Sequence, residues 1–165
     1  MIQLTIATPT DMEELGARVA TRLDAGDLVL LNGELGAGKT TLTRGLGAAL
    51  GVRGAVTSPT FVLARTHPRA EGVPLVHVDA YRLGSAVELD DLDIDFERSI
   101  VVVEWGAGLL DGIAENWLEI DIVRPHGSGD GHGTEVFDGP EPRRVTVTGH
   151  GERWQDLGWV GAALD

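Results

Sequence analysis

The sequence predicts a single α/β domain over residues 1–165, with a mostly parallel sheet flanked by helices. The length suits one compact domain that buries a sizeable hydrophobic core. Continuous apolar runs alternate along the chain with segments whose apolar side chains repeat at helical spacing. A glycine-rich turn lies directly between one apolar run and the helical segment that follows it. Apolar runs of this kind are typical of buried parallel strands, and their alternation with helices is typical of α/β folds.

The first part of the chain contains a predicted strand, helix, strand and helix, in that order. Residues 1–8 form the first strand, and the sequence Pro9-Thr10-Asp11 is typical of a helix start. We expect this helix to stop at Ala25-Gly26. Residues 28–32 are an apolar run of the kind found in central parallel strands. A second helix is predicted over residues 40–50.

The second part of the chain is predicted to complete the sheet. Further strands are expected at five runs, over residues 61–64, 75–78, 100–103, 118–123 and 144–148. Helical stretches are expected over residues 87–96, 108–114 and 155–164, the last forming a short C-terminal tail. A glycine- and histidine-rich polar segment without periodicity predicts a flexible loop at about residues 125–140.

The turn after residues 28–32 has the sequence GELGAGKT, from Gly33 to Thr40, which fits the P-loop pattern G-x-x-x-x-G-K-[ST]. Lys39 is the only lysine in the chain, since the other 12 of its 13 Lys and Arg residues are arginines. A compact ammonium reaches between the β- and γ-phosphates of a nucleotide, whereas a planar guanidinium is too broad. A P-loop presents backbone N–H groups to phosphates at a helix N-terminus, where the helix dipole also favours anions. We therefore expect this chain to bind a nucleoside triphosphate.

Two residues are predicted to hold a magnesium ion beside the phosphates. Thr40 follows the P-loop lysine, the position from which a hydroxyl binds the Mg²⁺ that bridges the β- and γ-phosphates. A second carboxylate normally steadies this ion from the end of an apolar strand, and Glu104 follows the run at residues 101–103. An exposed glutamate at a strand end is the alternative for Glu104, and the presence of the P-loop favours the metal.

Two further segments carry candidates for nucleotide hydrolysis. Asp79 ends another apolar run and Arg82 follows three residues later. Asp79 is predicted to position the attacking water or a metal-bound water, and Arg82 to neutralise developing charge. A strand-end ion pair is the alternative for these two residues. Thr60 or Ser58, within TSPTF, is a candidate sensor of the γ-phosphate, with a plain turn as the alternative.

The composition limits which nucleotide and which partners the chain is expected to bind. Guanine-specific GTPases carry an asparagine–lysine–x–aspartate signature, and no lysine remains to supply it, so ATP is favoured over GTP. The net charge of −13 argues against direct binding to DNA or RNA, because neutralised phosphates supply most of that affinity. The absence of cysteine and of any apolar run of membrane length predicts a soluble cytoplasmic protein.

Four sequence blocks resemble one known family. The blocks GELGAGKTTLTRGLGAALG, TSPTF, HVDAYRL and VVVEW occur in this order between Gly33 and Trp105. Together they are similar to the TsaE (YjeE-like) P-loop ATPases of bacterial tRNA threonylcarbamoyladenosine biosynthesis. The resemblance implies a weak ATPase that works with a TsaD–TsaB pair, which transfers a threonylcarbamoyl group to adenosine at tRNA position 37. ATP hydrolysis is expected to reset or sustain that complex, and tRNA to be reached only through these partners.

The resemblance also implies roles for individual residues. Magnesium is expected on Thr40 and Glu104, and roles in hydrolysis or switching are expected for Asp79, Thr60 and Trp105. Contacts to adenine are expected from Thr8 or Arg143. Phosphate binding is expected from the P-loop residues Glu34, Leu35, Gly36, Ala37, Gly38, Lys39, Thr40 and Thr41.

A P-loop kinase acting on a small molecule or nucleotide is the alternative function, because a domain of this size is also typical of those enzymes. Such a kinase requires an arginine-bearing lid, and Arg143-Arg144 is the only adjacent pair of arginines in the sequence. The dense acidic stretch within residues 88–97 is either a docking surface for a basic partner or a solvated helix face.

Overall fold

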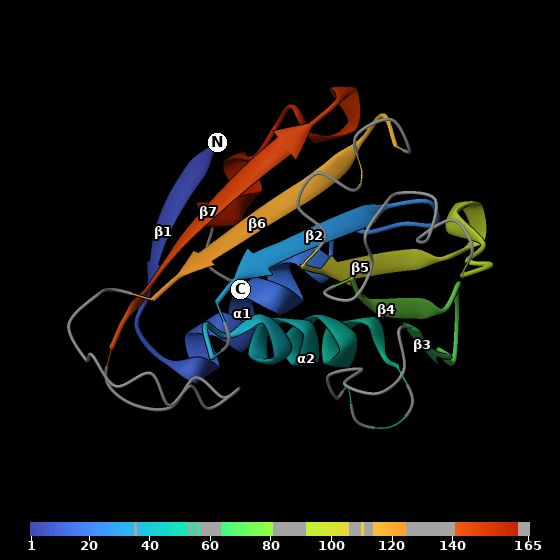
Figure 1. Cartoon of the computed structure of the whole chain (residues 1–165), viewed down its shortest axis with the longest axis horizontal. Coiled ribbons are helices and arrows are strands. Elements are labelled where there is room, and N and C mark those ends of the chain that lie inside the picture. The colour runs from blue at the N-terminus through green and yellow to red at the C-terminus, as the bar shows by residue number, and fades with distance from the viewer. Residues whose placement is uncertain are drawn as a thin grey trace.

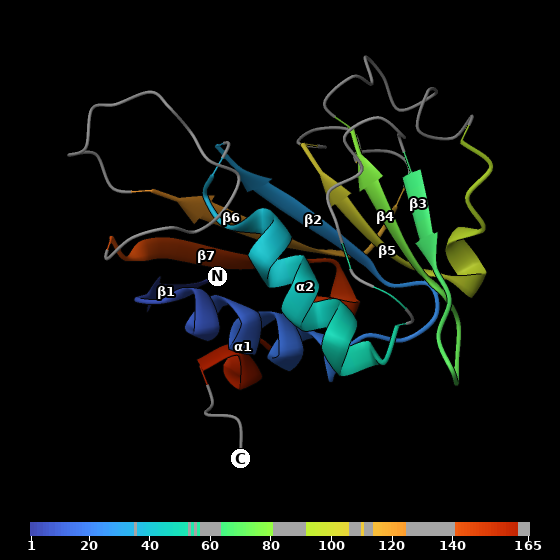
Figure 2. The same cartoon turned by 90° about the horizontal axis from the view of Figure 1, so that it is seen from below.

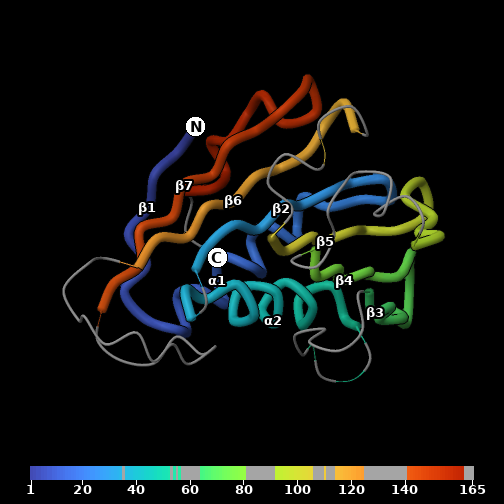
Figure 3. Tube along the Cα trace, in the orientation of Figure 1, coloured from blue at the N-terminus to red at the C-terminus, as the bar shows by residue number. Residues whose placement is uncertain are grey.

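One sheet of seven strands organises the part of the chain that the computed structural model describes, which is residues 1–34, 36–52, 54, 56, 64–80, 92–105, 110, 114–124 and 141–161. Its spatial order is β1-β7-β6-β2-β5-β4-β3 (Figure 1). The strands are β1 (Ile2–Ile6), β2 (Leu28–Gly33), β3 (Ala64–His67), β4 (Leu75–Asp79), β5 (Ile100–Glu104), β6 (Trp117–Val123) and β7 (Arg143–His150). The Cα trace in Figure 3 shows β1 and β7, from the two ends of the sequence, lying side by side.

The centre of the sheet is parallel and both outer parts are antiparallel. Strands β6, β2, β5 and β4 run in the same direction. Strand β7 pairs antiparallel with β6 and β1, and β3 pairs antiparallel with β4. Strand β5 is buried along its whole length, whereas β6 alternates buried and half-buried side chains. This difference is the one expected between a central parallel strand and a strand with one open face. The predicted α/β fold is confirmed.

Two α-helices, α1 (Pro9–Ala20) and α2 (Lys39–Leu50), pack together on one face of the sheet (Figure 2). Glycines let their backbones approach closely. A Cβ atom at Gly16 would collide with the carbonyl oxygen of Leu42, and one at Gly45 would collide with that of Glu13. The helix that begins at the predicted P-loop is therefore held against α1 as well as against the sheet.

On the opposite face of the sheet, described residues of other segments cover β2, β5 and β4. A second hydrophobic cluster there unites Leu28, Leu30, Val76, Val78, Val101 and Val103 of these strands with Leu92, Ile94, Phe96, Leu110 and Ala114. The predicted sheet flanked by helices thus has both of its described α-helices on one side.

Several predicted boundaries are corrected. The strands predicted at 75–78, 100–103, 118–123 and 144–148 are confirmed to within two residues. The helix predicted to reach Ala25-Gly26 ends at Ala20, because the backbone of Asp24 and the carboxylate of Asp27 hydrogen bond in a turn just beyond it. Of the strand predicted over 61–64, residues 61–63 lie outside the described residues, and β3 starts at residue 64.

The later helical predictions are also changed. Within 87–96, residues 92–95 are not helical, and Asp93 has a positive φ of 56°, which an α-helix does not contain. Short 3₁₀ turns stand in place of longer helices, at η1 (Phe96–Arg98), η2 (Glu152–Trp154) and η3 (Gly158–Gly161). The predicted C-terminal helix over 155–164 is thus only a 3₁₀ turn in its described part. Most of the helix predicted over 108–114 and all of the loop predicted over 125–140 lie outside the described residues.

No helix in the described part of the chain is long and apolar enough to cross a membrane.

Candidate nucleotide-binding site

The P-loop motif lies where the sequence predicted it, between the end of β2 and the start of α2. Gly38 is the N-cap of α2 and has φ of 120°, a conformation that side-chain-bearing residues rarely adopt. No side chain caps this helix terminus. The backbone N–H groups of the first turn of α2 are therefore presented at the carboxyl edge of the parallel strands, where an anion can accept from them.

The ammonium of Lys39 lies inside the loop. Its Nζ donates to the carbonyl oxygens of Gly33, at 2.7 Å, and Glu34, at 3.1 Å. It also lies 4.0 Å from the centroid of the Trp105 ring, within cation–π range. Lys39 is buried, so its charge is concentrated at the loop and screened little by solvent.

Glu104 occupies the last position of β5 at the same edge. The strand register places it beside Leu31 of β2 and Asp79 of β4. The Glu104 side chain is 3% exposed, and its Oε2 lies 3.5 Å from Nε2 of His77. Its Oε1 is buried without a hydrogen-bond partner. A buried carboxylate oxygen in this condition costs free energy unless a cation or a donor reaches it, so Glu104 fits the predicted metal-side role.

Trp105 follows Glu104 in a left-handed conformation, with φ of 62°. Its backbone N–H donates to the carbonyl oxygen of Leu31 at 3.2 Å, which ties this turn to β2. Strained non-glycine residues of this kind are concentrated at functional sites. The structure thus brings Lys39, Trp105, Glu104 and Asp79 to one edge of the sheet.

The remaining predicted residues have different positions. Thr40 is half-buried in the first turn of α2, and the Thr41 side chain is buried. The Oγ1 of Thr8 accepts from the N–H of Asp11 at 3.1 Å, so this hydroxyl caps α1. Its predicted contact with adenine stays a prediction. The other predicted residues, Leu35, Ser58, Thr60 and Arg82, lie outside the described residues.

Arg143 is fully buried, and its guanidinium donates to P-loop carbonyl groups. Nε lies 3.1 Å from the Ala37 oxygen, and Nη2 lies 3.3 Å from the Gly36 oxygen. The kinase alternative requires an arginine-bearing lid. An arginine that is buried against the P-loop backbone in this way does not belong to a lid. Sequence reasoning also missed His77, although its position two residues before Asp79 on a strand places both side chains on one face.

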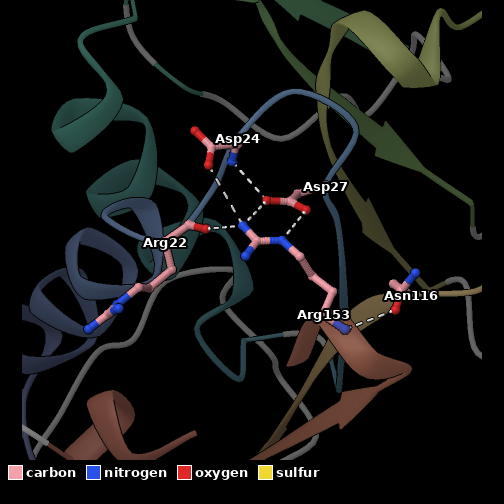
Figure 4. Close-up of polar contacts among 5 residues, drawn as sticks. All are labelled: Arg22, Asp24, Asp27, Asn116 and Arg153. Carbon is pink, nitrogen blue, oxygen red and sulfur yellow. Dashed lines mark hydrogen bonds and ion pairs between the residues drawn. The ribbon is translucent and has the colours of Figure 1, made fainter. Parts of the chain in front are cut away.

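A second group of polar side chains lies at the opposite, amino edge of the parallel strands (Figure 4). Arg153 donates from Nε and Nη2 to the two carboxylate oxygens of Asp27, at 3.1 and 2.8 Å, and from Nη2 to the Arg22 carbonyl oxygen at 2.8 Å. The backbone N–H of Arg153 donates to Asn116 at 3.1 Å. We call these residues, with Asp24, the amino-edge network.

A P-loop between a central parallel strand and a helix, with a buried strand-end carboxylate beside it, defines a P-loop fold. Comparison with known proteins narrows this class. The family model described as threonylcarbamoyl adenosine biosynthesis protein TsaE matches residues 6–130, and the chain belongs to this family. The family acts in tRNA threonylcarbamoyladenosine biosynthesis.

Individual relatives agree with this assignment. A protein of Streptomyces coelicolor named tRNA threonylcarbamoyladenosine biosynthesis protein TsaE is 58% identical over 147 residues, covering 87% of this chain and 93% of that protein. A protein of the same name from Bacillus subtilis is 31% identical over 153 residues, covering 90% and 86%. The crystal structure of Bacillus subtilis YdiB matches with a TM-score of 0.69 at 27% identity, covering 93% of this chain and 88% of that chain.

Proposed function

We propose that this chain binds and hydrolyses ATP with Mg²⁺, and that it serves as an accessory protein of a TsaD–TsaB-type complex in the threonylcarbamoyl modification of tRNA adenosine 37. The observation that carries the proposal is the buried ammonium of Lys39 inside the P-loop, at the same edge of the sheet as the buried Glu104 carboxylate, whose Oε1 has no hydrogen-bond partner. The names of the relatives support the tRNA pathway.

Phosphate binding would use groups that are already at the loop. Lys39 donates to the Gly33 and Glu34 carbonyl groups, and it can exchange these acceptors for phosphate oxygens, which carry more negative charge. The uncapped N-terminus of α2 supplies backbone donors from Gly38 onward. The residues proposed to contact phosphate are those predicted from sequence, Glu34 to Thr41.

Magnesium would be held by the Thr40 hydroxyl and the Glu104 carboxylate. The unsatisfied Oε1 of Glu104 is suited to a hard cation or to a water bound by one. Such an ion neutralises charge on the β- and γ-phosphates. Asp79, which pairs with Glu104 across the β4–β5 pair, would accept a hydrogen bond from the attacking water.

We propose three further roles. Thr60 or Ser58 would sense the γ-phosphate, and Arg82 would neutralise charge that develops during hydrolysis. Trp105 would respond to the nucleotide because the Lys39 ammonium lies over its ring. Phosphate binding to that ammonium would change this contact.

An acidic surface favours a basic protein partner over direct contact with tRNA. In the described part of the stretch at 88–97, Asp93, Asp95 and Glu97 are exposed, while Leu92, Ile94 and Phe96 pack on the sheet. This alternation directs carboxylates outward along one ridge. We propose that the ridge docks on the partner complex in the cytoplasm, and that tRNA is reached through that complex.

The test is ATP hydrolysis by the purified chain, with and without a purified TsaD–TsaB-type pair. We expect weak activity alone and marked stimulation by the pair. Indifference to the pair would contradict the accessory role. A parallel incubation with ATP and a panel of metabolites addresses the kinase alternative, because rapid phosphate transfer to a small acceptor would replace this proposal.

A further inference from the structure

Arg143 connects the first residue of β7 to the backbone of the P-loop, more than 100 residues earlier in the chain. The residue is 1% exposed. It donates to the carbonyl oxygens of two consecutive residues, Ala37 at 3.1 Å and Gly36 at 3.3 Å, and from Nη1 to that of Glu141 at 2.8 Å. The planar guanidinium of one side chain therefore binds two successive peptide groups of the loop.

The orientation of these carbonyl groups determines where the next amides point. A trans peptide is planar, so its N–H points away from its C=O. The N–H groups of Ala37 and Gly38 thus point away from Arg143. The Ala37 N–H donates to the Glu34 oxygen at 3.0 Å, the same oxygen that accepts from Lys39 at 3.1 Å. The amide and the ammonium therefore lie together on the inner side of the loop.

We propose that Arg143 is a positioning residue that holds the Gly36–Ala37 and Ala37–Gly38 peptides from outside the loop, so that the Ala37 amide stays on the Glu34 carbonyl group and the Gly38 amide faces the phosphates of a bound nucleotide. This inference rests on the proposed nucleotide binding. It is an alternative to the expectation that Arg143 contacts adenine, because Nε and Nη2 donate to the loop backbone.

The charge of Arg143 adds to this geometric effect. Burial lowers the pKa of Arg143, and the neighbouring charge of Arg124 lowers it further, whereas the Glu141 carboxylate raises it. An arginine nevertheless stays protonated in proteins. A buried cation directly behind the loop favours an anion on the inner side.

The sequence supplies a matched control in the next residue. Arg144 is exposed on the opposite face of β7, so Arg143→Met and Arg144→Met remove the same charge from adjacent positions. Binding of Mg-ADP and of Mg-pyrophosphate is measured by calorimetry for both variants and the unmodified protein. Pyrophosphate lacks adenosine, so it separates loop positioning from a contact with the base. The melting temperature without ligand is recorded for each.

We expect Arg143→Met to weaken both ligands by about tenfold or more, since hydrogen bonds to charged groups are strong, while Arg144→Met changes either by less than about twofold. Loss of Mg-ADP binding alone would overturn the inference in favour of a contact with adenosine. Equal losses in both variants would show that only net charge matters. Should the unmodified protein bind neither ligand, the proposed function would fall and this inference with it.

Arg143→Lys decides the matter if Arg143→Met does not fold. Lysine keeps the charge but lacks the planar fork that serves two carbonyl groups at once. We expect this variant to fold and to bind Mg-pyrophosphate more weakly than the unmodified protein does, with a loss of less than about tenfold. Unchanged affinity in this variant would overturn the inference.

Discussion

The carboxyl and amino edges of the parallel strands differ in how their ionisable side chains are partnered. At the carboxyl edge, Glu104 Oε1 and both ring nitrogens of His77 are buried without hydrogen bonds. At the amino edge, Arg153 reaches both carboxylate oxygens of Asp27, and one of those oxygens also accepts from the backbone of Asp24 (Figure 4).

This difference indicates that the two edges serve different purposes. A buried ionisable group without a partner lowers stability, and a ligand or a reaction is one reason for such a group to persist. A charged side chain that is paired with an opposite charge and also hydrogen bonded to the backbone joins elements of the fold. The amino-edge network joins η2 to the turn before β2 and the start of β6. We therefore expect substitutions at the carboxyl edge to affect function, and those at the amino edge to affect stability.

Lys39→Ala is expected to have the largest functional effect. Loss of the ammonium should weaken Mg-ATP binding by at least about 100-fold and abolish hydrolysis, because this charge lies directly at the phosphates. The free energy of unfolding should fall by about 1–3 kcal/mol, the order of magnitude of the hydrogen bonds that the charged donor makes. Calorimetry and urea unfolding measure the two quantities. Undiminished Mg-ATP binding would refute the site itself.

Glu104→Gln separates function from stability at the same edge. We expect hydrolysis to fall by about 100-fold or more, since the amide is a poor magnesium ligand. The free energy of unfolding should be unchanged or raised, because a neutral amide is less costly to bury than a carboxylate with an unsatisfied oxygen. Hydrolysis is assayed over a Mg²⁺ titration, and an active variant would show that the metal ligand is elsewhere.

Asp27→Asn tests the amino edge. The substitution removes the charge that Arg153 contacts through two nitrogens, and Arg153 is partly exposed, so we expect a loss of about 1–2 kcal/mol in the free energy of unfolding. Mg-ADP affinity should match that of the unmodified protein. A large drop in affinity without a change in stability would reverse the assignment of the two edges.

His67→Gln is expected to have the smallest effect on stability. His67 is an exception to the difference between the two edges. His67 pairs with Leu75 at the start of β4, toward the amino edge, yet its Nε2 is buried without a partner. Burial lowers the pKa of His67, and the charges of His77 on β4 and Arg65 on β3 lower it further.

Below the unfolded-state pKa of about 6.5, the unfolded chain therefore binds a proton that folded His67 resists, and stability falls as the pH decreases toward the folded-state pKa. Urea unfolding between about pH 7.5 and 5 should show a steeper loss for the unmodified protein than for His67→Gln. Parallel curves would show that His67 does not titrate as inferred.

Local patterns in the sequence were sufficient for much of the site. The apolar run before Gly33 and the helical spacing after Lys39 predicted a strand, loop and helix, and α2 begins at Lys39, one residue before the predicted start. Glu104 and Asp79 each end an apolar run, and parallel strands bring such ends to one edge. Periodicity is a property of neighbouring residues, so it is visible without the fold.

Local patterns misled where the chain is irregular. The acidic stretch near residue 93 has helix-forming composition, yet its apolar residues alternate inward because they cover the sheet. The C-terminal tail similarly follows the packing of Trp154 and Val160 in the core, and it forms 3₁₀ turns. Burial of side chains outweighed helix propensity in both segments.

The sequence alone was sufficient to predict the P-loop with its lysine and the glutamate at the end of a neighbouring strand. It was also sufficient to indicate the family to which the protein belongs. Only the tertiary structure decided that Arg143 supports the loop from β7, that His77 lies beside Glu104, and that Arg153 closes the amino edge. The physical reason is that a motif depends on residue types at fixed short spacings. A contact between residues more than 100 positions apart depends on strand order and register, which result from packing of the whole chain.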